Sequence, residues 1–256
     1  MLQEKSAAFR ELHKPGAPVV LGNIWDALGA RAAEEAGFPA VATTSETVAR
    51  SLGYEDFEAA PADEMLAAAA RIAGAVSVPV TVDVESGYGL EPAELVARLV
   101  KIGAAGLNIE DTDYRADKLA DPADQARRIA GIREAAEKIG VPLVINARTD
   151  VFLRAVTTGA AESSAVDEAV ARGKEYLAAG ADVVYPLLAS EEQIIGSLVE
   201  QLGPINVLAT PVAPSIERLA ELGVTRVSLG PGLGRGYEGW LKEELTGLAA
   251  KAKALG

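Results

Sequence analysis

The sequence of 256 residues predicts an α/β protein, in which residues 1–256 form a single (β/α)8 barrel domain. Short apolar segments alternate with amphipathic segments eight times, at a repeat of roughly 25 residues, which is typical of such barrels. The length is one that barrels occupy as a single domain, and no linker or charge run divides the chain. An open, doubly wound sheet is the competing fold. It normally has fewer strands and a Gly-rich first turn, a pattern that the segment NIWDALGA lacks.

The predicted strands are short apolar runs bounded by turn residues, which indicates strands buried in a sheet. Their ranges are 19–25, 40–44, 79–85, 107–110, 143–148, 183–187, 205–209 and 226–229.

Helix boundaries between these strands follow from capping residues. Asp26 can cap the first interior helix, prolines 61, 92 and 122 stand at helix starts, and glycines such as Gly37 and Gly103 follow helix ends. Segments 45–60, 111–121 and 155–163 are predicted as connections without regular structure. The run GPGLGRG, 230–236, is predicted as turns, with a phosphate-binding loop as the alternative. The predicted helices are 3–14, 27–36, 61–75, 92–102, 122–139, 166–179, 191–201, 215–222 and 237–254.

Composition excludes several classes of function. The 37 acidic against 24 basic residues argue against binding to nucleic acid or to a membrane surface, because both require basic patches. There is no Cys, so disulfides, thiolate zinc sites and a Cys nucleophile are excluded. The only His, His13, lies in a polar segment and is predicted to be a surface residue, which disfavours a Ser-His-Asp triad. No signal peptide or spanning run is found, so a cytoplasmic protein is expected.

The stretch PVTVDVESGYG, 79–89, carries the clearest chemical signal. Asp83 and Glu85 are two residues apart, so on an extended chain they point to the same side. Their repulsion requires a nearby positive charge or a protonated carboxyl group. A divalent cation with oxygen ligands is the simplest answer, and Mg²⁺ suits it best. The alternative is a strand end with solvated acids.

Barrel active sites lie at the C-terminal ends of the strands, so the residues there are candidates. Glu110 ends the fourth strand and Arg148 the fifth. Together with Asp83 and Glu85 they would converge on one mouth and bind a metal and an anion. Three other acids at these ends are better explained as helix N-caps, namely Asp26, Asp111 and Asp150. The remaining residues at the strand ends are Asn23, Trp25, Thr43, Thr44, Ser45, Glu46, Asn108, Asn146 and Thr149.

The motifs VDVESGYG, NIEDT and INARTD, in that order on the third, fourth and fifth strands, resemble the isocitrate lyase/phosphoenolpyruvate mutase superfamily. The likeness is to its phosphonomutase-like members, including the carboxyvinyl-carboxyphosphonate phosphorylmutase-like subgroup. The second-strand region EEAGFPAVATTSETVARSLGYED is also similar, so that the resemblance spans about residues 18–190. It implies a Mg²⁺-dependent enzyme that makes or breaks a C–C or P–C bond next to a 2-oxo or 2-hydroxy carboxylate, through a metal-stabilised enolate.

The resemblance also implies roles for individual residues. Mg²⁺ would be bound by Asp83, with Glu85 and Glu110 holding it largely through water. Arg148 would neutralise charge developing on the substrate oxygen. Asp56, in LGYED, would form a hydrogen bond near the metal waters.

Substrate binding and assembly are implied in the same way. The backbone N–H groups of the turn at Thr44, Ser45 and Glu46 would hold the carboxylate of a small carboxylate or phosphonate substrate. The last helix, LKEELTGLAAKAKAL, would swap onto a neighbouring subunit of a homodimer or homotetramer.

The segment after the fourth strand departs from the family pattern. Family lyases carry a Lys-Lys/Arg-Cys-Gly-His loop there, so the absence of Cys argues against isocitrate or methylisocitrate lyase activity. Phosphonomutases carry a longer loop with a Lys and an Asn. In the short DTDYRADKLADP the only cations are Arg115 and Lys118, which are catalytic candidates but are at least as well explained as solvated charges.

The reaction therefore stays open between a phosphonomutase-like isomerase, a lyase and a decarboxylase. Another metal-dependent pyruvate aldolase, or a non-catalytic barrel that binds a small carboxylate, is the alternative.

Overall fold

Eight strands form the centre of the computed structural model, which describes residues 1–254. They are β1 (Val19–Ile24), β2 (Val41–Thr43), β3 (Val80–Asp83), β4 (Gly106–Glu110), β7 (Val144–Thr149), β8 (Val183–Pro186), β9 (Asn206–Leu208) and β10 (Arg226–Ser228).

All neighbouring strands pair in parallel, in the order β8-β7-β4-β3-β2-β1-β10-β9. The two ends of this sheet meet at a parallel bridge between Val184 and Ile205, where the Val184 N–H donates to the carbonyl of Pro204 at 3.0 Å. The ring is thereby nearly closed, and the prediction of a (β/α)8 barrel is confirmed. Each predicted strand is present.

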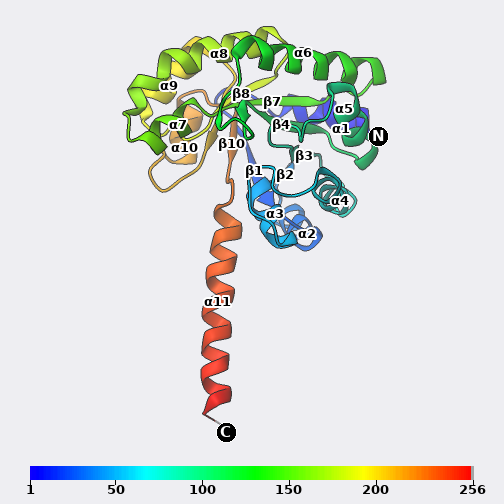
Figure 1. Cartoon of the computed structure of the whole chain (residues 1–256), viewed down its shortest axis with the longest axis vertical. Helices are drawn as coiled ribbons and strands as arrows, with labels where there is room; N and C mark the ends of the chain where they lie inside the picture. The colour runs from blue at the N-terminus through cyan, green and yellow to red at the C-terminus, as the bar shows by residue number, and fades with distance from the viewer. Residues whose placement is uncertain (255–256) are drawn as a thin grey trace.

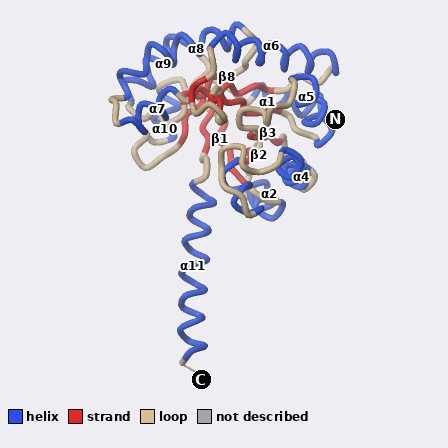
Figure 2. The backbone as a smooth tube through the Cα atoms, viewed as in Figure 1, coloured by secondary structure: helices blue, strands red, loops and turns tan. Residues whose placement is uncertain are grey.

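Helices surround the barrel on its outer face (Figures 1 and 2). Asp26 caps α2 as predicted, because its carboxylate accepts the N–H of Gly29 at 2.7 Å. Gly103 and Gly140 end α5 and α6 with positive φ angles of 84° and 79°, which glycine adopts without strain. The helices at predicted positions are α1 (Leu2–Glu11), α2 (Ala27–Glu35), α4 (Ala62–Ala73), α5 (Pro92–Ile102), α6 (Pro122–Ile139), α8 (Val166–Ala178), α9 (Glu192–Leu202) and α10 (Ile216–Glu221).

The predictions of unstructured connections and turns are wrong in four places. Segment 45–60 begins with a helix, α3 (Ser45–Leu52). Helix α7 (Val151–Thr158) extends into segment 155–163, and a short 3₁₀ helix (Glu162–Ala165) follows it. Segment 111–121 contains a small antiparallel hairpin of β5 (Thr112–Asp113) and β6 (Lys118–Leu119). The last helix, α11 (Gly232–Lys253), starts inside GPGLGRG. The short helices escape detection because they bury few residues: α3 buries only Ser45, Val48 and Ala49.

The N-terminal helix closes one end of the barrel. Phe9 of α1 is fully buried in a cluster that includes Leu21 and Val144 of the barrel strands. The buried guanidinium of Arg226 lies over the Phe9 ring, 5.9 Å from its centroid. His13 packs edge-on against Phe9, with ring centroids 4.8 Å apart. The prediction that His13 is a surface residue is therefore wrong.

The C-terminal helix leaves the barrel and extends away from it (Figures 1 and 2). In α11 only Gly234 is buried, while Trp240, Leu245 and Leu248 are more than half exposed. Within residues 1–254 no helix combines the length and apolarity that a membrane crossing requires. The cytoplasmic location and the single-domain organisation stay predictions.

Candidate active site

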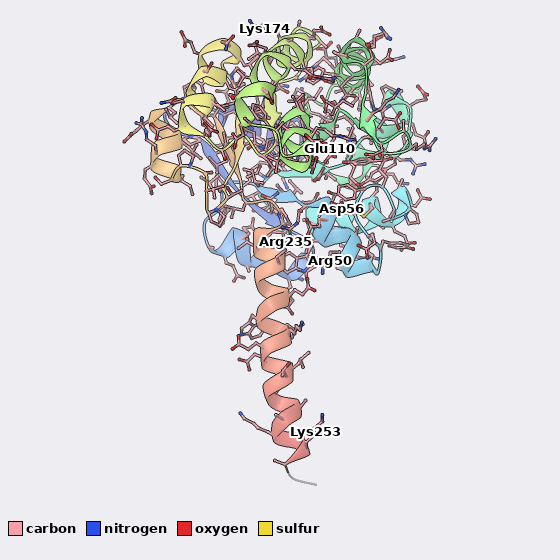
Figure 3. The ribbon with its side chains drawn as sticks, turned by 60° about the vertical axis from the view of Figure 1, so that its left-hand side comes forward. Arg50, Asp56, Glu110, Lys174, Arg235 and Lys253 are labelled. Carbon is pink, nitrogen blue, oxygen red and sulfur yellow. The ribbon has the colours of Figure 1, made fainter. Side chains whose placement is uncertain are left out.

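A cavity of about 280 Å³ opens among the loops that follow the C-terminal ends of the strands. Figure 3 shows two of its residues, Asp56 and Arg235, at the end of the barrel from which α11 departs. The lining residues are Asn23, Thr44, Ser45, Glu46, Asp56, Phe57, Asp83, Asn108, Arg148, Leu153, Tyr185, Leu187, Leu188, Leu208, Ser228, Gly230, Pro231 and Arg235.

Asp83 lies at the end of β3 and lines this cavity. Its backbone N–H donates to Thr43 Oγ1 at 2.8 Å, which ties β3 to the neighbouring β2. Its two carboxylate oxygens accept single, long bonds of 3.3 Å from the N–H groups of Ser45 and Glu85. Each oxygen therefore keeps lone pairs for a further partner.

Two more carboxyl groups lie close to Asp83. Glu85 is 1% exposed and accepts the N–H of Glu58 at 2.5 Å. Burial and the charge of Asp83 raise the pKa of Glu85 to about 8. Burial and Asp83 also raise the pKa of Asp56, whose buried Oδ1 has no hydrogen-bond partner. These carboxyl groups disfavour each other's charged forms, so a cation among them would be strongly favoured.

Arg148 lies between two acids at the cavity wall. Its Nε donates to Asp150 Oδ1 at 2.6 Å and its Nη2 to Oδ2 at 3.2 Å, while its Nη1 donates to Glu110. Burial alone would lower the pKa of Arg148, but Asp150 and Glu110 raise it well above its ordinary value. Glu110 also accepts the hydroxyl of Tyr114. Arg148 is therefore permanently charged and rigidly held.

Asp150 and Asp111 position this arginine rather than cap helices. Asp150 occupies the N-cap position of α7, but its side chain makes no capping bond and instead binds Arg148 and the hydroxyl of Thr112 at 2.6 Å. Its N–H donates to Asp111 at 2.9 Å, and Asp111 accepts the hydroxyl of Tyr176 at 2.8 Å. The interpretation as an N-cap is therefore wrong for Asp111, which a strand follows, while for Asp150 it is right for the position but not for the side chain. The sequence does indicate this contact, because Arg148 and Asp150 are two residues apart at a strand end and side chains at that spacing point to the same side.

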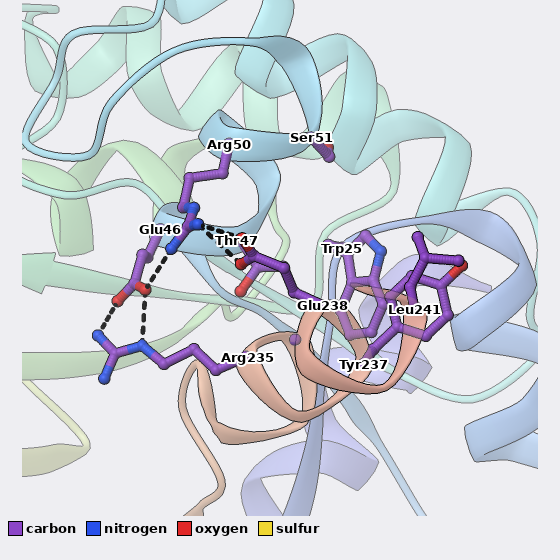
Figure 4. A pocket seen from close by; sticks show the side chains of 10 residues that line it. Trp25, Glu46, Thr47, Arg50, Ser51, Arg235, Tyr237, Glu238 and Leu241 are labelled. Atoms are coloured by element: carbon purple, nitrogen blue, oxygen red, sulfur yellow. Dashed lines mark hydrogen bonds and ion pairs between the residues drawn. The ribbon is translucent and has the colours of Figure 1, made fainter. Parts of the chain in front are cut away.

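The turn predicted to bind a carboxylate is the first turn of α3. Thr44 is its N-cap and provides no side-chain capping bond. A helix N-terminus carries partial positive charge and free N–H groups, so it can bind an anion. The Glu46 carboxylate, which also lines the cavity, accepts hydrogen bonds from Arg235 Nε at 2.8 Å and Nη2 at 2.6 Å (Figure 4).

Arg115 and Lys118 are not brought to this cavity. Both are exposed on the β5–β6 hairpin. Arg115 lines a separate hollow of about 410 Å³, together with Tyr114 and Glu110.

The sequence pattern does not single out three polar residues of the cavity, Tyr185, Ser228 and Arg235, or its leucines. Tyr185 of β8 is 5% exposed and lies opposite Arg148 in the sheet register. Burial raises the pKa of Tyr185, so its hydroxyl stays protonated at neutral pH. No charged pair marks the ends of β8, β9 and β10, so the sequence pattern does not single out the residues there.

A metal at this site would depend on water for most of its ligands. Among residues 1–254 no three His, Cys, Asp or Glu side chains are grouped closely enough to hold a metal together. Mg²⁺ fits such a site because it keeps several waters and takes only one or two carboxylates. Asp83 and Asp56, which line the cavity and have unused oxygens, are the residues best placed to hold it.

Comparison with known proteins identifies one family and solved structures of the same fold. The family model of phosphoenolpyruvate phosphomutase matches residues 9–248. A crystal structure of a candidate phosphonomutase from Burkholderia cenocepacia J2315 is 40% identical and has a TM-score of 0.90, covering 95% of this chain and 99% of that one.

Two further similar proteins are named for other activities, a decarboxylase and a lyase. The oxaloacetate decarboxylase of Pseudomonas entomophila (strain L48) is 30% identical over 85% of this chain and 75% of its own. The structure of 2,3-dimethylmalate lyase, a member of the PEP mutase/isocitrate lyase superfamily, is 25% identical with a TM-score of 0.82, covering 97% of this chain and 87% of that one.

Proposed function

Because this chain belongs to the phosphoenolpyruvate phosphomutase family, within the PEP mutase/isocitrate lyase superfamily, we propose that it is a Mg²⁺-dependent phosphonomutase-like isomerase or carbon–carbon lyase. It makes or breaks a C–C or P–C bond next to a 2-oxo or 2-hydroxy carboxylate through an enolate. The observation that carries this proposal is the group of Asp56, Asp83 and Glu85, in which burial and the nearby Asp83 raise the pKa values of Asp56 and Glu85, beside a permanently charged Arg148.

Asp83 would bind the metal, Glu85 and Glu110 would help to hold it, and Asp56 would accept a hydrogen bond beside it. The unpartnered Oδ1 of Asp56 supports this arrangement. When bound, Mg²⁺ supplies Lewis-acid stabilisation of negative charge on the 2-oxo oxygen of the substrate. The raised pKa of Glu85 is then lowered by the cation, since an opposite charge favours the carboxylate.

Arg148 stabilises the oxygen on which charge develops when the bond breaks. Fixed donors are effective in this role because they need no reorganisation during the reaction. Asp150 and Glu110 keep the guanidinium fixed through hydrogen bonds to Nε, Nη2 and Nη1. The N–H groups of Thr44, Ser45 and Glu46 hold the substrate carboxylate at the start of α3.

The catalytic roles predicted for Arg115 and Lys118 remain predictions. Both side chains lie outside the cavity lining, so the β5–β6 hairpin must move for either to reach a substrate.

We also propose that the protein is a homodimer or homotetramer in which α11 packs on a neighbouring subunit. The apolar side chains of Trp240, Leu241, Leu245 and Leu248 support this, because a single chain leaves them between 36% and 57% exposed. Burial of such a surface is the main source of stability in subunit association.

Turnover with chosen substrates tests the proposal. The protein is incubated with 3-phosphonopyruvate, oxaloacetate or 4-hydroxy-2-oxo acids, with Mg²⁺ or with EDTA, and the products are followed by ¹H and ³¹P NMR. We expect turnover of at least one compound with Mg²⁺ and none with EDTA or in Asp83→Asn. The control Asp26→Asn retains activity, because Asn caps a helix as well as Asp. Turnover that persists in EDTA would contradict the proposal.

A further inference from the structure

Resting on the proposed function, we infer that the substrate carries an uncharged aliphatic tail, bound by leucines on the side of the cavity opposite Asp83. This excludes phosphonate and carboxylate tails and narrows the reaction to cleavage or formation of a C–C bond. Four leucines of the cavity wall form what we call the tail subsite: Leu187, Leu188 and Leu208, at the ends of β8 and β9, and Leu153 of α7, which follows β7.

The strand order places the tail subsite across the mouth from the acids. Leu208 ends β9 and Leu187 follows β8. In the ring of eight strands, β9 lies four positions from β3, and β8 four positions from β2. Asp83 is the last residue of β3, and the first turn of α3 follows β2. A substrate whose carboxylate is held at that turn therefore directs its other end toward the leucines.

Within residues 1–254, both cations that line the cavity are already paired with acids. The lining has three acids, Glu46, Asp56 and Asp83, against two arginines. Arg148 is bound by Glu110 and Asp150, and Arg235 is bound by both oxygens of Glu46. A phosphonate dianion moved from water to the leucines would lose its hydration without a compensating partner, which is costly.

The tail subsite is built with local backbone strain. Leu188 has a φ of 71°, a conformation that a leucine rarely adopts. Strain of this kind persists where surrounding structure imposes it, and it gathers at ligand sites. Gly230 also lines the cavity, and a Cβ at this position would lie 2.6 Å from Leu208 Cδ1. The absence of a side chain at Gly230 therefore allows Leu208 to occupy its position. The four leucines are all only partly buried, which leaves apolar surface for a ligand to cover.

Matched pairs of 2-oxo acids test the inference. The pairs are 4-methyl-2-oxopentanoate with oxaloacetate, and 4,4-dimethyl-2-oxopentanoate with 3-phosphonopyruvate, since each pair differs in tail charge at nearly constant shape. Their Kd values are measured by displacement of oxalate in Mg²⁺, together with the series pyruvate, 2-oxobutyrate and 2-oxopentanoate. We expect the alkyl member of each pair to bind at least tenfold more tightly. Each added methylene should tighten binding about fourfold.

The variant Leu208→Asn should abolish the gain per methylene, and its oxalate affinity reports whether the metal end still folds. Leu28→Asn, a change of the same kind at a 75% exposed leucine of α2, should behave as wild type. Oxalate binding with equal or tighter binding of the charged tails would overturn the tail subsite alone. Failure of oxalate to bind to the wild type with Mg²⁺ would overturn the proposed function and the tail subsite together.

Discussion

Charge balance among single residues governs the candidate site. Burial, and secondly Asp83, raise the pKa values of both Glu85 and Asp56, whereas Glu110 and Asp150 each form an ion pair with Arg148. The first group therefore favours an added cation, and the second keeps a donor in place. A carboxyl group of this site thus favours an added cation where no arginine lies beside it, and holds the guanidinium in place where Arg148 does.

His13 gives a pH dependence that is separate from the site. Burial, and secondly the charge of Arg226, lower the pKa of His13 from 6.5 to about 4. The unfolded chain then binds more protons than the folded protein between these pH values. Stability is therefore complete above pH 6.5 and falls as the pH decreases toward 4. Between pH 7.5 and 5 we expect the wild type to lose about 2 kcal/mol more than His13→Gln, by urea unfolding. Parallel pH profiles of the two proteins would contradict this.

At the scale of elements, the first turn of α3 links the cavity to the C-terminal helix. Glu46 lies in this turn and binds Arg235 of α11, while Arg50 of α3 binds Glu238 at 2.8 and 2.7 Å (Figure 4). Trp25 and Tyr237 contact each other with ring centroids 5.6 Å apart and ring planes tilted by 36°. The position of α11 is therefore coupled to the loop that is proposed to hold the substrate carboxylate.

Gly234 permits this contact and provides a test of it. A Cβ at this position would lie 2.4 Å from Thr47 Cγ2, while one at Gly236 would meet nothing within 4 Å. We expect Gly234→Ala to destabilise the protein by about 1–3 kcal/mol through overpacking. Gly236→Ala, the matched control, should be neutral or stabilising, because alanine favours a helix. Thermal unfolding of both variants measures the difference, and equal melting temperatures would show that α11 does not pack on α3.

The sequence predicts elements and strand-end residues where a periodic pattern of apolar residues or a helix-capping residue indicates them. The strand pattern places Asp83 and Arg148 at the mouth, and Asp26 reads correctly as a cap. The partners of buried acids were not predictable, because Asp111 meets Tyr176 and Asp150 meets Thr112 only through packing of separate elements. α3 reads as a loop because most of its residues are polar.

At the scale of the whole molecule, the barrel folds around its own core, whereas α11 is proposed to mediate assembly. The barrel buries its own core, whereas α11 beyond Gly234 exposes its apolar side chains. An isolated helix in this position gains most of its stability from packing against something else.

Sedimentation velocity tests the assembly that we propose. The wild type should sediment as a dimer or larger, and Trp240→Glu should lower the order of assembly by placing a charge in the interface. Lys242→Glu, which changes charge on the same exposed helix, should leave assembly intact. A monomeric wild type would contradict an intersubunit role for α11.

The central claim is that Asp83 and Mg²⁺ together create a site for a 2-oxo carboxylate. Calorimetric titration of oxalate, which resembles the enolate of pyruvate, tests it most directly on wild type and Asp83→Ala, each with Mg²⁺ and with EDTA. We expect binding to the wild type with Mg²⁺ only, and none to Asp83→Ala under either condition. Binding to the wild type in EDTA, undiminished binding to Asp83→Ala, or no binding to the wild type with Mg²⁺ would contradict it.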